Sequence, residues 1–381
     1  MRSLQFVFFI FLIFFSSKKK EIQEPSSNIS SFGERKISLI VSAPNVPGIK
    51  DQPISGKGIL VLYPYDGSIY IGYGDGGANT GPIGILSYNI TKNIFEMPYK
   101  AMTEDIIAFK EIGGDLYVPN EDPHVDLYGS VFLYDKSQKL WKKKKAIPGA
   151  GHIYSVVDFK DKIFICTGSD GPYPGMVAST TDKGDSWQIE HSTSHLNTNA
   201  DYVRYIHLAA TSTELFTSGF VFGSEFRQFG YLYRDGNWIE IKNIPVYSLC
   251  YPFVLNDKFF LANYRGPVKF GGGLKQDSSQ YVIDADTLKK ENLIPKELSI
   301  IKWDKQKLYN TNIEYLWVLF INKSSGACEI YNTADFRNWN KIIALPQLGN
   351  GAEYTAITYF ENNIYLGTST GDLYLLKEIY K

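Results

Sequence analysis

The chain has 381 residues, of which 44% are hydrophobic, 15% aromatic and 21% charged, and its formal net charge is −1 at pH 7. A nearly neutral chain carries no overall field that points to nucleic acid, so we expect no such partner. The three cysteines are too few for a disulfide framework, and no Cys/His spacing typical of zinc occurs. We therefore expect no metal and no cofactor.

The N-terminus is expected to direct export. Arg2 precedes a run over 4–15 that is apolar apart from Gln5, and Ser16 and Ser17 follow it. Such a run is too short for a comfortable membrane span but fits the core of a signal peptide. We expect 1–17 to be a signal peptide or an uncleaved signal anchor, and the protein to be periplasmic, on the cell surface or extracellular, touching the membrane only through this segment. Residues 18–35 are polar and Ser-rich, which predicts a flexible linker.

One pattern then recurs seven times. In each copy a short polar turn is followed by an apolar residue, an aromatic residue and one further residue. The central aromatics of successive copies lie 44 to 57 residues apart. They are Tyr70, Tyr117, Phe164, Phe216, Phe260, Trp317 and Tyr365. A repeat of about 40 to 50 residues built from short strands is typical of a β-propeller. The sequence thus predicts an all-β fold over 36–381, a seven-bladed β-propeller of four-stranded antiparallel blades.

The two ends of the predicted propeller complement each other. Only 377–381 follow the last strand-like segment, too few for a fourth strand, whereas 36–42 is strand-like and precedes the first blade. We expect this N-terminal strand to close the last blade, because closure removes an exposed sheet edge. The protein is expected to be a monomer.

One turn carries a recognisable motif. The residues that define it are Thr180, Asp182, Gly184, Ser186 and Trp187. Their spacing resembles the Asp-box, S/T-x-D-x-G-x-T/S-W, of BNR-repeat propellers in the sialidase-like superfamily. The resemblance implies a structural role, in which side-chain oxygens accept bonds from turn amides, glycine supplies an unusual backbone and tryptophan packs on the sheet. In that family the boxes lie away from the catalytic face.

Candidate site residues lie on the loops after each aromatic strand and at the start of each innermost strand. Variable loops on a rigid scaffold commonly carry binding residues. The candidate ligand-binding residues are Asp75, Asn79, Asp122, His124, Asp170, His207, Tyr264 and Arg265. Positions twelve residues before the central aromatics supply ionisable groups beside the predicted channel. These candidate catalytic residues are Asp105, His152, Arg204 and Glu353.

Two classes of function stay open at this point. The first is an exported propeller that binds a glycan or peptide on its loop-rich face without catalysis, which suits loops rich in Tyr, Asn and Asp. The alternative is a glycoside hydrolase or lyase related to sialidases, in which Asp105 and Glu353 act as a carboxylate pair. The ionisable positions also fit a solvated channel mouth with no catalytic role, and the fold itself does not choose among these functions.

Overall fold

The computed structural model describes residues 37–42, 45–124, 126–168, 174–193, 200–223, 227–242, 244, 251–262 and 280–380. The chain divides into two units, 1–35 and 36–381, and the expected signal segment and linker lie outside the described residues. The described part of the second unit is almost entirely β-strand, with short 3-10 helices at η2 (Ile54–Gly56) and η3 (Gly76–Ala78). None of the helices described is long and apolar enough to cross a membrane.

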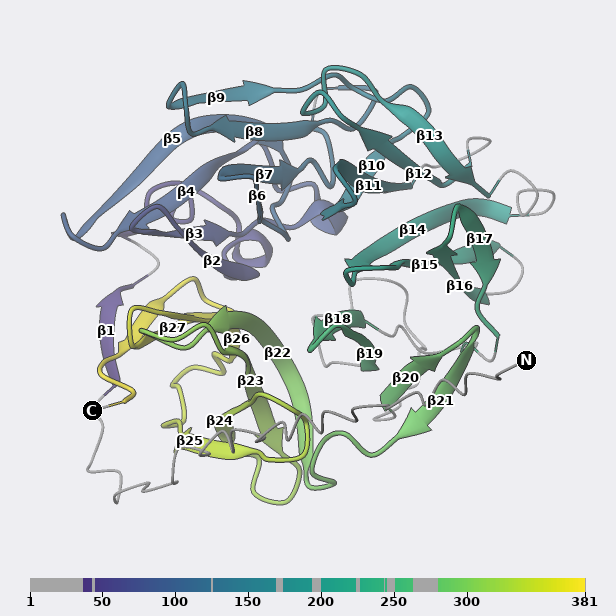
Figure 1. Ribbon diagram of the computed structural model, residues 1–381. Helices are drawn as coiled ribbons and strands as arrows, with labels where there is room; N and C mark the ends of the chain where they lie inside the picture. Colours follow the sequence, from purple (N-terminus) through teal and green to yellow (C-terminus); the bar gives the residue numbers. More distant parts are fainter. Residues whose placement is uncertain are drawn as a thin grey trace, which may run out of the picture. The chain divides into compact units, whose positions relative to one another are not determined.

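Four sheets are simple antiparallel meanders, in which strands adjacent in sequence pair with each other (Figure 1). Sheet β2–β5 consists of β2 (Val61–Tyr65), β3 (Ser68–Gly72), β4 (Ile83–Asn89) and β5 (Ile94–Thr103). Sheet β6–β9 consists of β6 (Lys110–Ile112), β7 (Asp115–Pro119), β8 (Val131–Asp135) and β9 (Leu140–Lys143). Sheet β18–β21 consists of β18 (Tyr251–Leu255), β19 (Lys258–Ala262), β20 (Gln280–Asp284) and β21 (Thr287–Glu291). Sheet β22–β25 consists of β22 (Leu298–Lys307), β23 (Glu314–Asn322), β24 (Cys328–Thr333) and β25 (Asn340–Ala344).

The last sheet contains strands from both ends of the second unit. Its strands are β1 (Ile37–Val41), β26 (Tyr354–Phe360), β27 (Asn363–Thr368) and β28 (Leu373–Leu376). β1 pairs antiparallel with β28, so that Ile37 lies opposite Leu376 and Val41 opposite Leu373. The predicted closure by the N-terminal strand is confirmed.

The remaining strands form one sheet of eight. They are β10 (His152–Phe159), β11 (Lys162–Gly168), β12 (Met176–Thr180), β13 (Gln188–Ser192), β14 (Ala200–Ala210), β15 (Leu215–Gly223), β16 (Arg227–Arg234) and β17 (Asn237–Glu240). β11 pairs with β14 through Gly168 and Arg204, which joins two four-stranded meanders. The structure therefore shows five separate four-stranded blades rather than the seven predicted, because this pairing merges the strands β10–β17 into one sheet.

The repeated aromatics occupy equivalent places. Each lies in the second strand of its meander, in β3, β7, β11, β15, β19, β23 or β27, and each is at most 9% exposed. Aromatic side chains favour such pleated, buried surfaces because one ring covers much of a neighbouring sheet. The repeat in the sequence thus marks the interior of the fold.

The first strands of successive meanders contact one another in turn. Glu111 N in β6 donates to Tyr63 Oη in β2 at 3.0 Å, and Lys110 in β6 pairs with Asp158 in β10 at 3.6 Å. Further along, Thr358 Oγ1 in β26 donates to Asp304 Oδ2 in β22 at 2.5 Å. These contacts give the propeller arrangement, in which small antiparallel sheets follow one another around the second unit (Figure 1).

Candidate functional site

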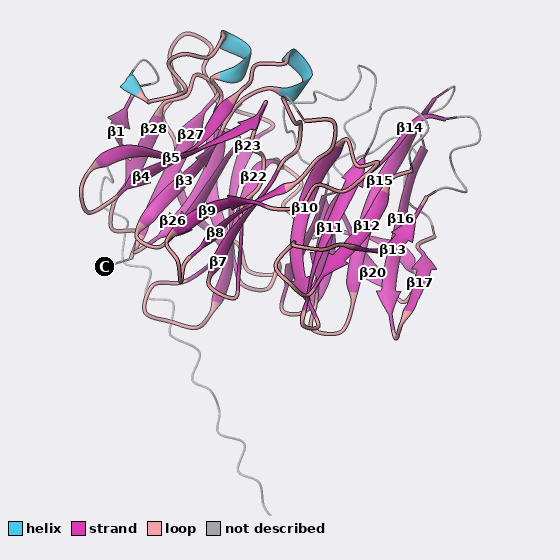
Figure 2. Ribbon diagram, turned by 90° about the horizontal axis from the view of Figure 1, so that it is seen from above, coloured by secondary structure: helices cyan, strands magenta, loops and turns pink. Residues whose placement is uncertain are grey.

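Three connections between strands meet beside sheets β2–β5 and β6–β9, and we call them the platform. The platform consists of the β3–β4 loop (73–82), the β5–β6 connection (104–109) and the described parts of the β7–β8 loop (120–124 and 126–130). Backbone bonds join the three, since Ile106 N donates to Tyr73 O and Glu104 N donates to Asp122 O, each at 2.9 Å. The short helices lie at one end of the strands (Figure 2), and η3 belongs to the platform. Satisfied backbone groups hold the side chains of these connections in defined positions.

Asp105 lies at the centre of the platform and is 3% exposed. Its Oδ2 accepts a hydrogen bond from Gly76 N at 3.1 Å, whereas its Oδ1 has no hydrogen-bond partner among the described residues. Gly74 makes this placement possible, because its φ is +104° and an added Cβ would lie 2.7 Å from the Cα of Asp105. The result is a buried carboxylate with one oxygen available to a hydrogen-bond donor.

His152, the first residue of β10, lies beside Asp122. Its Nδ1 is 2.8 Å from the carbonyl oxygen of Glu121 and 3.6 Å from Asp122 Oδ1. A backbone carbonyl only accepts hydrogen bonds, so Nδ1 carries the hydrogen and donates it to Glu121 O. The imidazole also stacks on the Tyr154 ring, with the ring centres 5.6 Å apart. Two predicted residues, Asp122 and His152, are thus brought together by different sheets.

The pKa of Asp122 is displaced upward. Burial, together with the negative charges of Glu104 and Asp105, raises it to about 6 against the opposing effects of His152 and Arg204. The carboxylates of Asp105 and Asp122 both approach Gly76, since an added Cβ there would lie 3.3 Å from Asp105 Oδ2 and 2.9 Å from Asp122 Oδ2. A nearby negative charge disfavours ionisation of Asp122. Asp122 can therefore exchange a proton near neutral pH.

Glu104 is a platform residue that the sequence analysis did not identify. It is 7% exposed; its Oε1 lies 3.2 Å from His124 Nδ1, and its Oε2 has no hydrogen-bond partner within the described ranges. The position twelve residues before the central aromatic gives one candidate in each repeat. In this repeat the candidate is Asp105, and the preceding residue, Glu104, is not selected. The run Thr103-Glu104-Asp105 was the signal available, because an irregular connection can turn adjacent side chains to the same side.

Asp75 and Asn79 shape the β3–β4 loop. Asp75 Oδ1 caps η3 by accepting a bond from Ala78 N at 3.2 Å, and Asn79 is exposed with φ of +49°. Thr80 ties the loop to its neighbour, since its Oγ1 accepts from Asp75 N at 2.8 Å and donates to Glu104 O at 3.4 Å. A helix cap is a structural role, so these two predicted residues position the platform.

Arg204 and His207 both lie on β14 but in different surroundings. The guanidinium of Arg204 lies over the Tyr202 ring at 4.4 Å, and its charge acts on Asp122. His207 packs against Tyr251, with ring centres 4.3 Å apart, and burial lowers its pKa to about 3. His207 is therefore neutral at physiological pH, and no described contact joins it to the platform.

Glu353 is not brought to the platform. Its side chain is exposed, and its backbone N–H donates to Ser369 Oγ at 3.0 Å. Burial raises the pKa of the Cys328 thiol to about 12, and the charge of Glu353 adds to that shift, which places Glu353 near β24. The expected pairing of Glu353 with Asp105 has no described contact to support it. Three further candidates, Asp170, Tyr264 and Arg265, lie outside the described residues.

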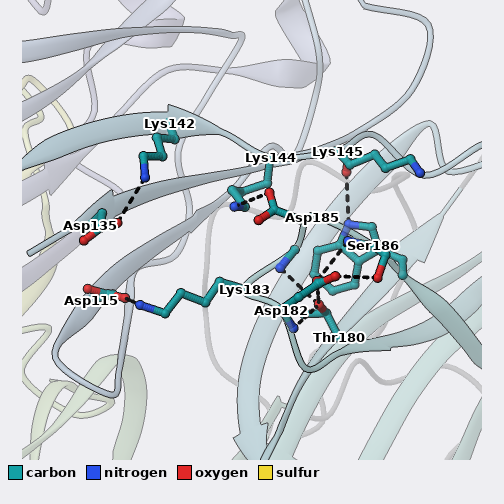
Figure 3. Close-up of polar contacts among 12 residues, drawn as sticks. Asp115, Asp135, Lys142, Lys144, Lys145, Thr180, Asp182, Lys183, Asp185 and Ser186 are labelled. Atoms are coloured by element: carbon teal, nitrogen blue, oxygen red, sulfur yellow. Dashed lines mark hydrogen bonds and ion pairs between the residues drawn. The ribbon is translucent and has the colours of Figure 1, made fainter. Parts of the chain in front are cut away.

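The Asp-box turn has the bonding expected of a structural motif (Figure 3). Asp182 Oδ1 accepts from Thr180 Oγ1 at 2.6 Å and from Ser186 N at 2.9 Å, and Thr180 Oγ1 accepts from Gly184 N at 3.0 Å. These bonds hold the pKa of Asp182 well below its usual range. The turn satisfies its own backbone amides with its own side chains.

The same turn docks on sheet β6–β9. Trp187 Nε1 donates to Lys145 O at 3.0 Å, and Lys183 Nζ reaches Asp115 Oδ2 at 2.7 Å (Figure 3). A second, degenerate turn repeats part of this bonding, since Trp339 Nε1 donates to Leu293 O at 3.0 Å. These turns fasten neighbouring sheets together.

The platform offers hydrogen-bond acceptors and one group that titrates near neutral pH. Within the described ranges no group of three or more His, Cys, Asp or Glu side chains is placed to hold a metal ion. The polar side chains described at and beside the platform include carboxylates, imidazoles and the Arg204 guanidinium. Such a set can bind hydrogen-bond donors, and Asp122 can give or take a proton.

Several solved structures are similar to this chain. A catalytically inactive virginiamycin B lyase from Staphylococcus aureus with quinupristin aligns at TM-score 0.53 and 12% identity, over 90% of this chain and 99% of that one. A chain of the mitotic checkpoint complex aligns at TM-score 0.54 and 10% identity, over 99% of this chain and 98% of that one. The computationally designed Ika8 protein aligns at TM-score 0.50 and 11% identity, over 89% of this chain and 99% of that one. No protein-family model and no curated protein matches the chain.

These similarities show the β-propeller fold alone. Identities of 12% and below carry no information about the ligand, because unrelated functions share this fold. The resemblance to Asp-box propellers continues to rest on the turn at 180–187 and on the repeat.

Proposed function

We propose that the protein is an exported β-propeller that binds a glycan or peptide at the platform. The observation that carries the proposal is Asp105, whose buried carboxylate keeps Oδ1 without a partner among the described residues. A buried acceptor without a donor costs free energy, and a ligand hydroxyl or N–H group placed there removes that cost. Convergent polar groups on loops over a rigid scaffold are typical of ligand sites.

Several finer features belong to this proposal. Counting the eight-stranded sheet as two blades gives seven blades in all, and the turn at 180–187 favours a place among the Asp-box propellers. Residues 1–17 direct export and provide the only contact with a membrane, and the exported protein is a monomer.

A second candidate function is hydrolysis or elimination on a bound glycan. One observation favours it, namely the pair Asp105 and Asp122, whose carboxylates both approach Gly76 while the pKa of Asp122 is raised to about 6. A carboxyl group with a raised pKa can serve as a general acid beside a second carboxyl group. This pair takes the place of the pair Asp105 and Glu353 expected from the sequence.

Array binding tests the first candidate. The purified protein is applied to glycan and peptide arrays beside Asp105→Asn, which keeps the shape but removes the charge, and beside Glu240→Gln, a matched change at an exposed position in β17. We expect Asp105→Asn to weaken binding at least tenfold and Glu240→Gln to leave it unchanged. The proposal fails if no ligand binds, or if the wild type and both variants bind equally. Release of a new reducing or unsaturated end from a bound glycan would favour the second candidate.

A further inference from the structure

The platform concentrates negative charge. Its acidic side chains are Asp75, Glu104, Asp105, Glu121, Asp122 and Asp126, the last of which pairs with Lys143 in β9. The first four are each at most 9% exposed, and Asp122 is 29% exposed at its side chain. Of the described groups that act most on Asp122, Glu104 and Asp105 are acidic, and Arg204 is a permanent cation. Buried like charges create a strong local field that attracts a cation.

Two adjacent residues of this set, Asp105 and Glu104, are 3% and 7% exposed. In each of them one carboxylate oxygen, Asp105 Oδ1 or Glu104 Oε2, accepts no hydrogen bond from the described residues. A hydroxyl donor would satisfy the acceptor but leave the buried charge uncompensated. An ammonium or guanidinium group donates a hydrogen bond to the carboxylate and also compensates its charge. Such charge-assisted hydrogen bonds are about twice as strong as neutral ones.

The two most exposed large apolar side chains of the described residues lie on segments that belong to the platform or are bonded to it. Ile54 is 88% exposed and Leu127 is 79% exposed. Ile54 begins η2, whose Gly56 O accepts from Gly74 N of the platform at 3.1 Å, and Leu127 belongs to the β7–β8 loop of the platform. Exposed apolar side chains near convergent polar groups are typical of protein or peptide contacts, since a glycan covers them poorly.

We propose that the platform binds a short basic peptide, whose lysine or arginine side chain contacts Asp105 and Glu104 and whose apolar residues pack on Ile54 and Leu127. This inference rests on the proposed function and names its ligand class. It accounts both for the buried charge and for the two apolar side chains at the edge. A neutral glycan accounts for neither.

Calorimetric titration with matched peptides tests this inference. The probes are acetylated, amidated pentapeptides with leucines on both sides of a central lysine, arginine, norleucine or citrulline. We expect the lysine or arginine peptide to bind at least tenfold more tightly than its neutral counterpart. Asp105→Asn should remove this preference, whereas Glu240→Gln should keep it. Ile54→Ser combined with Leu127→Ser should weaken all four peptides several-fold without changing the preference.

The outcomes separate this inference from the proposed function. Equal affinity for charged and neutral peptides overturns the cationic class. A neutral glycan that binds in an Asp105-dependent manner, with no binding of the basic peptides, also overturns it but leaves the platform as the ligand site. If neither glycans nor peptides bind at millimolar concentration, both proposals fail. Circular dichroism melting of each variant checks that a loss of binding is not a loss of fold.

Discussion

Asp122 illustrates how single residues are tuned at the platform. Burial, together with the nearby Glu104 and Asp105, raises its pKa to about 6. The ionised form is therefore disfavoured in the folded protein, although it is the form that would attract a cationic ligand. Because of this group, a rise in pH should increase the affinity for a cationic ligand and decrease the stability of the fold.

The affinity for a cationic ligand should follow the ionisation of Asp122. In the folded protein the carboxylate forms as the pH rises through about 6, so affinity for a basic peptide is expected to fall several-fold between pH 7.5 and pH 5. Asp122→Asn should bind more weakly at pH 7.5 and show less of this fall. Calorimetry at several pH values measures both effects. An unchanged pH profile in the variant would exclude Asp122 as the titrating group.

The stability of the folded state should change in the opposite sense. The folded pKa of Asp122, about 6, lies above its ordinary value of 3.8, so the folded state binds the proton more tightly than the unfolded chain does. The carboxylate thus destabilises the fold at pH 7, and this cost disappears as the pH falls toward 4. Because the side chain is 29% exposed, we expect Asp122→Asn to raise the free energy of unfolding at pH 7 by only about 1 to 2 kcal/mol. Urea denaturation at pH 7 and pH 4 measures the difference, which should vanish at the lower pH.

Gly76 provides a steric test of the same site. An added Cβ would lie 2.9 Å from Asp122 Oδ2 and 3.3 Å from Asp105 Oδ2, so Gly76→Ala must displace at least one carboxylate. We expect a loss of affinity of about tenfold with a small change in stability, because side chains can yield where backbone cannot. Gly349→Ala, where an added Cβ meets nothing within 4 Å, is the control. Wild-type affinity in Gly76→Ala would mean that the carboxylates do not contact the ligand.

At the scale of elements, turns join one sheet to the next. The turn after β12 satisfies itself through Thr180 and Asp182 and then places Trp187 and Lys183 on sheet β6–β9. The Asp-box turn therefore also forms a contact between its own sheet and sheet β6–β9. Its effect is on stability, since it touches none of the platform residues described.

Gly184→Ala should loosen this junction. The φ of Gly184 is +90°, and an added Cβ would lie 3.0 Å from Trp187 Cζ2 and 3.2 Å from Lys144 Cβ. We expect a loss of about 2 kcal/mol in urea denaturation, from backbone strain together with the displaced tryptophan. Gly236→Ala has a similar φ of +84° with nothing near its Cβ, and should lose about 1 kcal/mol from strain alone. Equal losses in the two variants would show that the contact with Trp187 contributes nothing.

An element can be predicted from the sequence when the interactions that form it involve residues close together in the chain. The aromatic strands were predictable because a large apolar residue, such as Trp317, recurs in the second strand of each repeat within an alternating pattern of buried residues. The merging of β10–β17 was not, because it depends on a single backbone pair, Gly168 and Arg204. Asp105 was found because the repeat places it, whereas Glu104 reaches the site through the path of an irregular connection.

At the scale of the molecule, the order of the strands ties distant parts of the chain together. The β1 strand pairs with β28, and Ile59 N, which precedes β2, donates to Thr368 O at the end of β27 at 2.9 Å. The first and last sheets are thus joined by hydrogen bonds between segments about 300 residues apart. Such long-range closure makes every sheet depend on the ends of the unit.

Removal of β1 should therefore destabilise the whole propeller. Ile40 and Val41 pack on the buried cluster that includes Ile59, and Ile37 packs on the cluster that includes Leu376. Partial burial of these three side chains, at about 1 kcal/mol each, suggests a loss of about 3 kcal/mol on deleting 1–42. The bare edge of β28 should also promote self-association. Deleting 1–36, which leaves β1 in place, is the matched control, and urea denaturation with analytical ultracentrifugation measures both properties. Equal midpoints and equal sedimentation of the two truncated proteins would show that β1 covers the edge without holding the ring together.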